Sequence, residues 1–145
     1  MALEAFRATL RGLSGVNVHV EPVNADAERD GLLRTDLQTD VESALREAGF
    51  EVVTQSRLFA AVQGTPVLHL DVMTAGFRER YVYSIRLELW QAVRLVRDPS
   101  AQALAVTWCA PQLLGVVTRE SLFTLRQTVR STVDEFVRDC RAAAA

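Results

Sequence analysis

The residue types best suited to chemistry are a histidine and an aspartate two positions apart. His69 and Asp71 lie in the segment 67–74, where apolar and polar residues alternate. Alternation of this kind is typical of a strand, so both side chains project from one face. An imidazole beside a carboxylate can be a pair of metal ligands or an oriented general base. His19 lies in another alternating segment and is the second histidine of the chain.

Whether these residues form a site depends on how the strands pair. Glu88 or Cys109 would join His19, His69 and Asp71 only in a suitable register, which the sequence does not fix. We favour a solvated sheet face with scattered polar groups, and expect no catalytic residue, metal ion or cofactor. The alternative is a small ligand- or metal-binding enzyme with His69 and Asp71 on a sheet face.

Other catalytic signatures are missing from the sequence. No serine has the Gly-x-Ser-x-Gly setting of a strained nucleophile, and the seven glycines are isolated, so no loop is built to hold a phosphate. The two cysteines, Cys109 and Cys140, are too few for a paired zinc site. We expect buried, inert thiols; a single disulfide is the other possibility if the compartment is oxidising.

The charge balance excludes a general affinity for polyanions. All 16 basic residues are arginine, and they face 18 acidic residues for a net charge of −2. Arginines are interleaved with acids along the chain, so we expect no nucleic-acid partner. Tyr81 and Tyr83 could stack bases, but they share a strand face with Ile85 and belong in the core. No apolar run reaches the length of a transmembrane segment.

The first half of the chain predicts a strand, a helix and a second strand. Segment 16–20 alternates valine with polar residues. Segment 24–31 is turn-like. Thr35 and Gln38 match a capping box for a helix that ends at Gly49, in the position of a left-handed C′ residue. A short strand over 51–54 would then pair in parallel with the first strand. Residues 56–62 are typical of a helical turn.

The second half is mainly β. A strand over 67–74 is followed by a turn over 75–80 and a long strand over 81–97. That length predicts a bulge or bend near Gln91. After a turn at 98–100, segment 103–109 returns, with Leu104, Val106 and Trp108 expected on one face. Residues 111–118 are ambiguous, and an amphipathic helix with Thr118 as its N-cap closes the chain.

These elements predict a single α+β domain over residues 1–145, with a leader over 1–14 and a folded core over 15–141. The expected architecture is a two-layer α/β sandwich of order β-α-β-β-β-β-α. Its mixed, mostly antiparallel sheet carries two helices on one face. A chain of 145 residues can bury a sufficient core without metal or disulfide.

The order of these elements resembles small domains of the bacterial envelope. That pattern is followed by the helix ending at 45–50, the strand after it and then Ser56-Arg57-Leu58, the strands around 81–95, the pair Thr107-Trp108 and the closing helix. Over residues 16–141 the chain resembles the amino-terminal domain of TolB, the periplasmic protein of the Tol-Pal system, and also the curli-secretion lipoprotein domain. The resemblance implies an exported, non-catalytic protein that acts through protein contacts, and it supplies no catalytic residues.

Residues 1–15 contain no apolar core of a signal peptide. We therefore expect a periplasmic or envelope-associated protein if a signal peptide has been removed, and a cytoplasmic one otherwise.

Protein association is the function that the surface pattern favours. The second face of the long strand mixes apolar side chains and an indole with arginines, as an interface core and rim do. Our candidate interface residues are Trp90, Val82, Arg86, Arg94 and Val96. The partner is another protein or a second copy, and a homodimer is one form of the latter.

Overall fold

The computed structural model describes residues 2–54 and 64–145. The elements, in chain order, are α1 (Ala2–Ala8), β1 (Gly15–Val20), α2 (Ala25–Arg29), α3 (Arg34–Glu47), β2 (Glu51–Val52), β3 (Val67–Phe77), β4 (Arg80–Arg94), β5 (Gln102–Cys109), β6 (Leu113–Thr118), the 3₁₀ helix η1 (Arg119–Thr124) and α5 (Leu125–Ala144). The helical turn expected over residues 56–62 lies outside the described residues.

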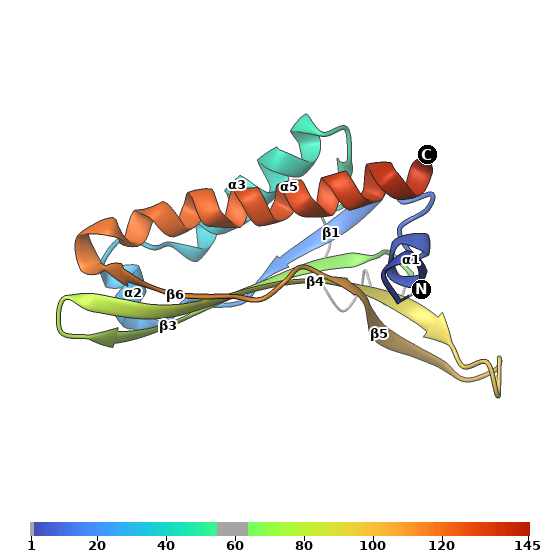
Figure 1. Cartoon of the computed structure of the whole chain (residues 1–145), viewed down its shortest axis with the longest axis horizontal. Coiled ribbons are helices and arrows are strands. Elements are labelled where there is room, and N and C mark those ends of the chain that lie inside the picture. Colours follow the sequence, from blue (N-terminus) through green and yellow to red (C-terminus); the bar gives the residue numbers. More distant parts are fainter. Residues whose placement is uncertain (1, 55–63) are drawn as a thin grey trace.

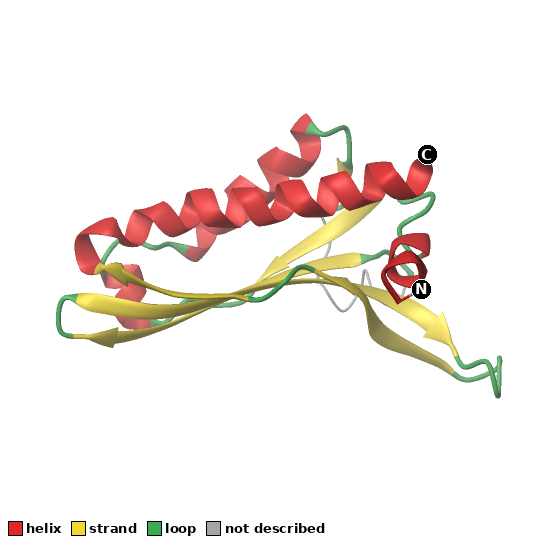
Figure 2. Ribbon diagram, viewed as in Figure 1, coloured by secondary structure: helices red, strands yellow, loops and turns green. Residues whose placement is uncertain are grey.

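The fold is a two-layer α+β arrangement, which confirms the expected class. A mixed sheet has the strand order β2-β1-β3-β4-β5, and β6 also pairs with β4. Strand β1 is parallel to β2 and β3, and all other pairs are antiparallel. Helices α3 and α5 lie side by side on one face of the sheet (Figures 1 and 2). We call the opposite face the open face.

The core lies between the sheet and these two helices. Alternate residues of β1, β3 and β4 point toward the helices and are buried. They meet the apolar stripes of α3 and α5, as the spacing of Val41, Leu45, Val129, Val133 and Phe136 predicts. The remaining residues of the same strands therefore point to the open face.

Helix α3 begins differently from the capping-box expectation, which was wrong. Leu33 is the N-cap and makes no side-chain cap hydrogen bond. Thr35 lies inside the first turn, and the Gln38 amide donates to the carbonyl of Val18 at 3.1 Å. Because β2 pairs with β1 only at 15–16, the carbonyl of Val18 lies beyond that pairing, where the Gln38 side chain reaches it. The helix ends as expected, at Gly49 with φ of +92°.

The hairpin between β3 and β4 is longer and tighter than the expected turn over 75–80. Pairing continues to Phe77 opposite Arg80. Only two residues, Arg78 and Glu79, connect the strands, and Arg78 adopts a φ of +57°. Such a two-residue connection needs positive φ to match the twist of the strands.

A bulge where β4 pairs with β5 corrects the expected orientation of Trp108. The register shifts between Leu89 and Trp90, so Leu89 lies opposite Trp108 and Trp90 opposite Val106. Trp108 consequently points into the core and is buried, whereas Leu104 is exposed. The sequence predicted a bulge or bend near Gln91, which is the residue after Trp90.

Two short segments gain structure beyond the sequence expectation. The turn-like stretch 24–31 contains α2, and the ambiguous stretch 111–118 forms β6. Leu10, just after α1, is buried in the core. Thr118, expected as the N-cap of the closing helix, accepts a hydrogen bond from the backbone N–H of Ser121 and caps η1, which leads into α5.

Candidate functional site

The open face brings both histidines of the chain together. In the parallel pairing of β1 with β3, His19 lies directly opposite His69. Their rings stack with centroids 5.4 Å apart and planes inclined by 17°. The register, which the sequence left open, therefore makes the two histidines cross-strand neighbours.

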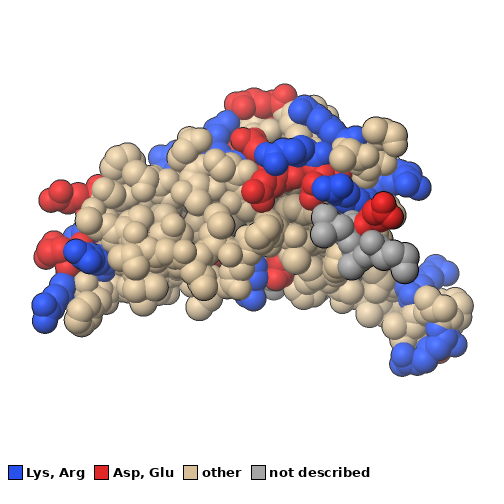
Figure 3. Space-filling view, in the orientation of Figure 1, with Lys and Arg blue, Asp and Glu red and all other residues tan. Residues whose placement is uncertain are grey.

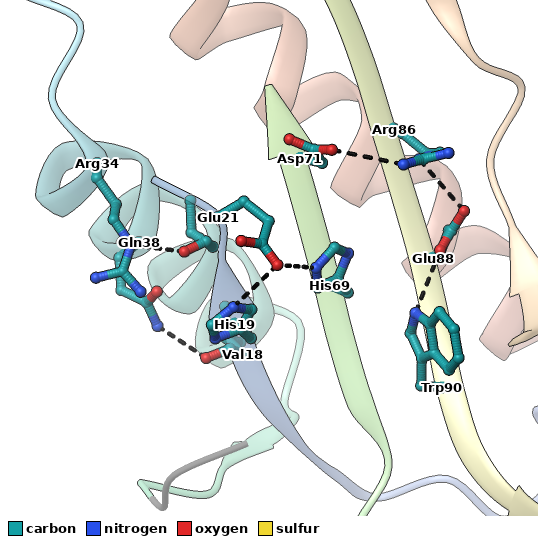
Figure 4. A network of polar contacts seen from close by, with 11 residues as sticks. Val18, His19, Glu21, Arg34, Gln38, His69, Asp71, Arg86, Glu88 and Trp90 are labelled. Carbon is teal, nitrogen blue, oxygen red and sulfur yellow. Dashed lines mark hydrogen bonds and ion pairs between the residues drawn. The ribbon is translucent and has the colours of Figure 1, made fainter. Parts of the chain in front are cut away.

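Glu21 joins the histidines, and the sequence reasoning missed it. Its Oε1 lies 2.8 Å from Nε2 of His69 and 3.3 Å from Nε2 of His19 (Figure 4). The side chains are partly buried, with 12%, 23% and 33% of their surface exposed for His69, His19 and Glu21. The available signal was the spacing of His19 and Glu21, which puts both on one face of a strand. We call these three residues the His–Glu–His cluster.

Asp71 does not join this cluster through the contacts that the structure shows. Its carboxylate pairs with Arg86 on β4, at 3.5 Å, and Arg86 also approaches Glu88 at 3.4 Å. Glu88 in turn accepts a hydrogen bond from the indole N–H of Trp90, at 3.2 Å. Figure 4 shows this row running along β4 beside the His–Glu–His cluster. The carboxylate that lies beside His69 is therefore that of Glu21, and Asp71 pairs with Arg86.

Farther along the same face, the polar row gives way to apolar side chains. The register aligns Met73, Ser84 and Leu114 across three strands, and next to them Ala75, Val82 and Val116. Five large apolar residues here are between 53% and 74% exposed: Met73, Phe77, Val82, Leu114 and Val116. We call them the apolar patch. Contiguous exposed apolar surface of this kind marks interaction sites in soluble proteins.

The side of the molecule at β6 also carries few charges. Seen with β6 and α5 in front, a broad area over β6 and the first half of α5 shows no charged side chains (Figure 3). The outer edge of β6 pairs with no strand among residues 2–54 and 64–145. Free strand edges pair readily with another chain unless charges or proline prevent it.

The predicted interface residues fall in different parts of the open side. Val82 belongs to the apolar patch, and Arg86 and Trp90 form the polar row beside it. Arg94 ends β4, and Val96 is 99% exposed in the loop of the β4–β5 hairpin, which projects beyond the helices (Figure 1). The structure thus brings Val82, Arg86 and Trp90 together on one face and places the other two at the end of the hairpin.

The two cysteines are free thiols. Cys140 is buried in α5, as expected for packing, but Cys109 is exposed at the end of β5 opposite Glu88, which corrects its predicted burial. Burial, helped by the charge of Asp139, raises the pKa of Cys140 to about 12. Cys140 therefore stays protonated and unreactive at neutral pH.

Comparison with known proteins shows the fold. No family model matches the chain, and no curated protein matches it in sequence. Two structures of the PelC dodecamer from Paraburkholderia phytofirmans are similar, with a TM-score of 0.51 each and 18% and 17% identity. The similarity covers 90% and 93% of this chain and 90% of the PelC chain in both cases. Rare lipoprotein B from Shewanella oneidensis has a TM-score of 0.39 and 12% identity, over 87% of this chain and 94% of its own.

In the described part of the chain, no helix is both long and apolar enough to cross a membrane.

Proposed function

We propose that this chain is a non-catalytic module that acts by binding further copies of itself through the open face of its sheet. The observation that carries the proposal is the apolar patch, which the fold leaves uncovered while α3 and α5 cover the opposite face. Burying apolar surface is the main driving force of association, at roughly 25 cal/mol per Å². A second copy would remove the patch from water.

The surroundings of the patch fit an interface between like copies. Arg86, Glu88 and Trp90 form a polar, partly apolar rim next to an apolar centre, which is the usual anatomy of such surfaces. A net charge of −2 on 145 residues produces little repulsion between copies. The uncharged side at β6 and its free edge offer a second, adjoining contact, in which strands pair across chains.

The similarity to PelC supports self-association as the kind of assembly. The two PelC structures with this fold are dodecamers. A chain that exposes two different surfaces, a sheet face and a strand edge, can form head-to-tail contacts, and such contacts close into rings. We therefore propose a closed homo-oligomer: a ring built from such head-to-tail contacts, or a homodimer in which two apolar patches meet each other.

We also propose that the module works in the bacterial envelope. The support is the resemblance of its element order to the amino-terminal domain of TolB. Fractionation of cells that carry the native gene checks this, and recovery of the protein in the cytoplasm alone would contradict it.

The test of self-association compares the mass in solution of the wild-type protein with that of patch variants. Leu114→Glu and Val82→Glu each place a charge in the apolar patch at an exposed position, so folding should be retained. Phe6→Glu is the matched control, because Phe6 is a similarly exposed apolar residue on α1, away from the open face.

Size-exclusion chromatography with light scattering should find the wild type and Phe6→Glu as oligomers and both patch variants as monomers. Oligomers that survive both patch substitutions would show that the patch is not the interface. A monomeric wild type would refute self-association itself.

A further inference from the structure

The His–Glu–His cluster brings three metal-ligating side chains to one point of the open face. Ligand atoms of His19, Glu21 and His69 lie within 4.8 Å of one another. Both Nε2 atoms approach the same carboxylate oxygen, at 2.8 Å and 3.3 Å. In Figure 4 the two rings and the carboxylate converge from β1 and β3.

The distances are close to the spacing that a small divalent cation requires. Nitrogen and carboxylate ligands lie about 2.0–2.2 Å from a tetrahedral zinc ion, so neighbouring ligand atoms are about 3.4 Å apart. The two separations from Glu21 Oε1, 2.8 Å and 3.3 Å, need to change by at most about 0.6 Å to reach that value, and the two ring nitrogens, within 4.8 Å of each other, need to approach by at most about 1.4 Å. Two imidazoles and one carboxylate are also a donor set that zinc uses, with water in the fourth position.

The sheet fixes the backbone positions of all three ligands. His19 and His69 are held opposite each other by the parallel pairing of β1 with β3. Glu21 follows His19 by two positions, and its backbone N–H donates to the carbonyl of Leu70 at 2.9 Å, which continues that pairing. Ligands on paired strands are ordered before the metal arrives, which lowers the entropic cost of binding.

Charged residues of both signs surround the cluster among the described residues. Glu88 lies opposite His69 in the pairing of β3 with β4, and Asp71 is two residues along β3. Arg86 offsets one of these two carboxylates, and Arg34 donates to the carbonyl of Val20 at the β1 edge. The partial exposure of the three ligands gives an ion a path from solvent.

One feature limits the affinity. Nδ1 of His69 is buried and has no hydrogen-bond partner among the described residues. A metal-bound histidine normally donates its other ring N–H to an acceptor, and such partners are worth about 10–100-fold in affinity. We therefore expect the metal to bind more weakly here than at a site where each histidine donates its second ring N–H to a hydrogen-bond acceptor.

From this geometry we infer that His19, Glu21 and His69 form a binding site for one divalent transition-metal ion, best suited to Zn²⁺. The inference is independent of self-association, since it concerns three residues outside the apolar patch.

The test titrates metal into protein that carries no polyhistidine tag and has been treated with a chelator. Co²⁺ is the first probe, because its visible absorption reports ligand geometry, and Zn²⁺ is then added in competition. The site variants are His19→Gln, Glu21→Gln and His69→Gln. The matched controls are Asp71→Asn and Glu88→Gln, which remove carboxylates from the same face but not from the site. Circular dichroism establishes that each variant is folded.

We expect one equivalent of metal per chain in the wild type and both controls, and at least about a 10-fold loss of affinity in each site variant. Glu21→Gln is the decisive variant if a histidine substitution impairs folding, because Glu21 is the most exposed of the three ligands. No binding by the wild type, or equal binding by wild type and Glu21→Gln, would overturn the inference.

Discussion

Among single residues, Arg126 has a contact that the sequence could not reveal. It lies on α5 and forms two hydrogen bonds with Asp40 of α3, at 2.8 Å and 2.9 Å. The hydrogen bonds and the charge of Asp40 raise the pKa of Arg126. The partners are 86 residues apart in sequence, and their contact links the two helices that cover the sheet.

Removing this guanidinium should destabilise the protein. Arg126→Ala leaves the carboxylate of Asp40, whose side chain is only 10% exposed, without its partner. We expect the free energy of unfolding to fall by about 1–3 kcal/mol, measured by urea denaturation. Arg130→Ala is the control, because Arg130 pairs with the well-exposed Glu47, and its effect should stay below about 1 kcal/mol. Equal effects of the two substitutions would contradict the role of Arg126.

The two thiols should differ sharply in reactivity. Native protein treated with iodoacetamide at about pH 8 should be alkylated at Cys109 alone, since Cys140 is buried with a pKa of about 12. Unfolding returns Cys140 to its ordinary pKa of 9.0, so its contribution to the free energy of unfolding decreases as pH rises from 9.0 to about 12. Peptide mass spectrometry reads the labelled sites. Similar labelling rates at both cysteines would show that Cys140 is not protected.

Glu21 shows which part of the candidate site the sequence pattern could predict and which part it could not. Alternation correctly assigned His69 and Asp71 to one face of their strand, because side-chain direction in a strand is a local property. It could not show that β1 pairs with β3, nor the register between them. The pairing of β1 with β3 places His19 and Glu21 beside His69. The pairing of β3 with β4 places Asp71 beside Arg86, with which it forms an ion pair.

Among the elements, β6 depends on a close approach that requires glycine. Gly115 lies opposite Tyr83 of β4. A Cβ atom at this position would lie 2.5 Å from the Tyr83 hydroxyl and 2.7 Å from its ring carbon Cζ, closer than real Cβ contacts. The tyrosine ring therefore lies across the backbone of β6. Only glycine, which has no Cβ atom, leaves room for the ring at this position.

Gly115→Ala should loosen the pairing of β6 with β4. We expect a loss of about 1–3 kcal/mol in the free energy of unfolding, from overpacking. Tyr83→Leu removes the obstructing ring, so the double variant should lose less than the sum of the two single losses. Urea denaturation of the four proteins measures this coupling. Strictly additive losses would mean that the contact does not determine the cost.

The elements that were predicted well rest on local periodicity. Strands β1, β3 and β4 and helices α3 and α5 each present a clear apolar stripe. The errors lie where long-range contacts decide. The start of α3 is set by contacts with β1, and the face of Trp108 is set by the bulge opposite β4. Strand β6 lacks a clear pattern because both of its faces include apolar residues.

At the scale of the whole molecule, the fold divides its surfaces unevenly. One face of the sheet is covered by α3 and α5, and the other exposes a polar row, a His–Glu–His cluster and an apolar patch (Figures 1 and 4). Several of the arginines form local ion pairs, such as those of Arg86 and Arg119. This uneven division is consistent with the proposed self-association through the open face.

The most direct test of self-association is the mass of the untagged wild-type protein in sedimentation velocity over a dilution series. Self-association predicts a species at a whole-number multiple of 16.1 kDa that dissociates on dilution or persists as a closed ring. A single species of 16.1 kDa at every concentration, up to the highest attainable, would contradict it.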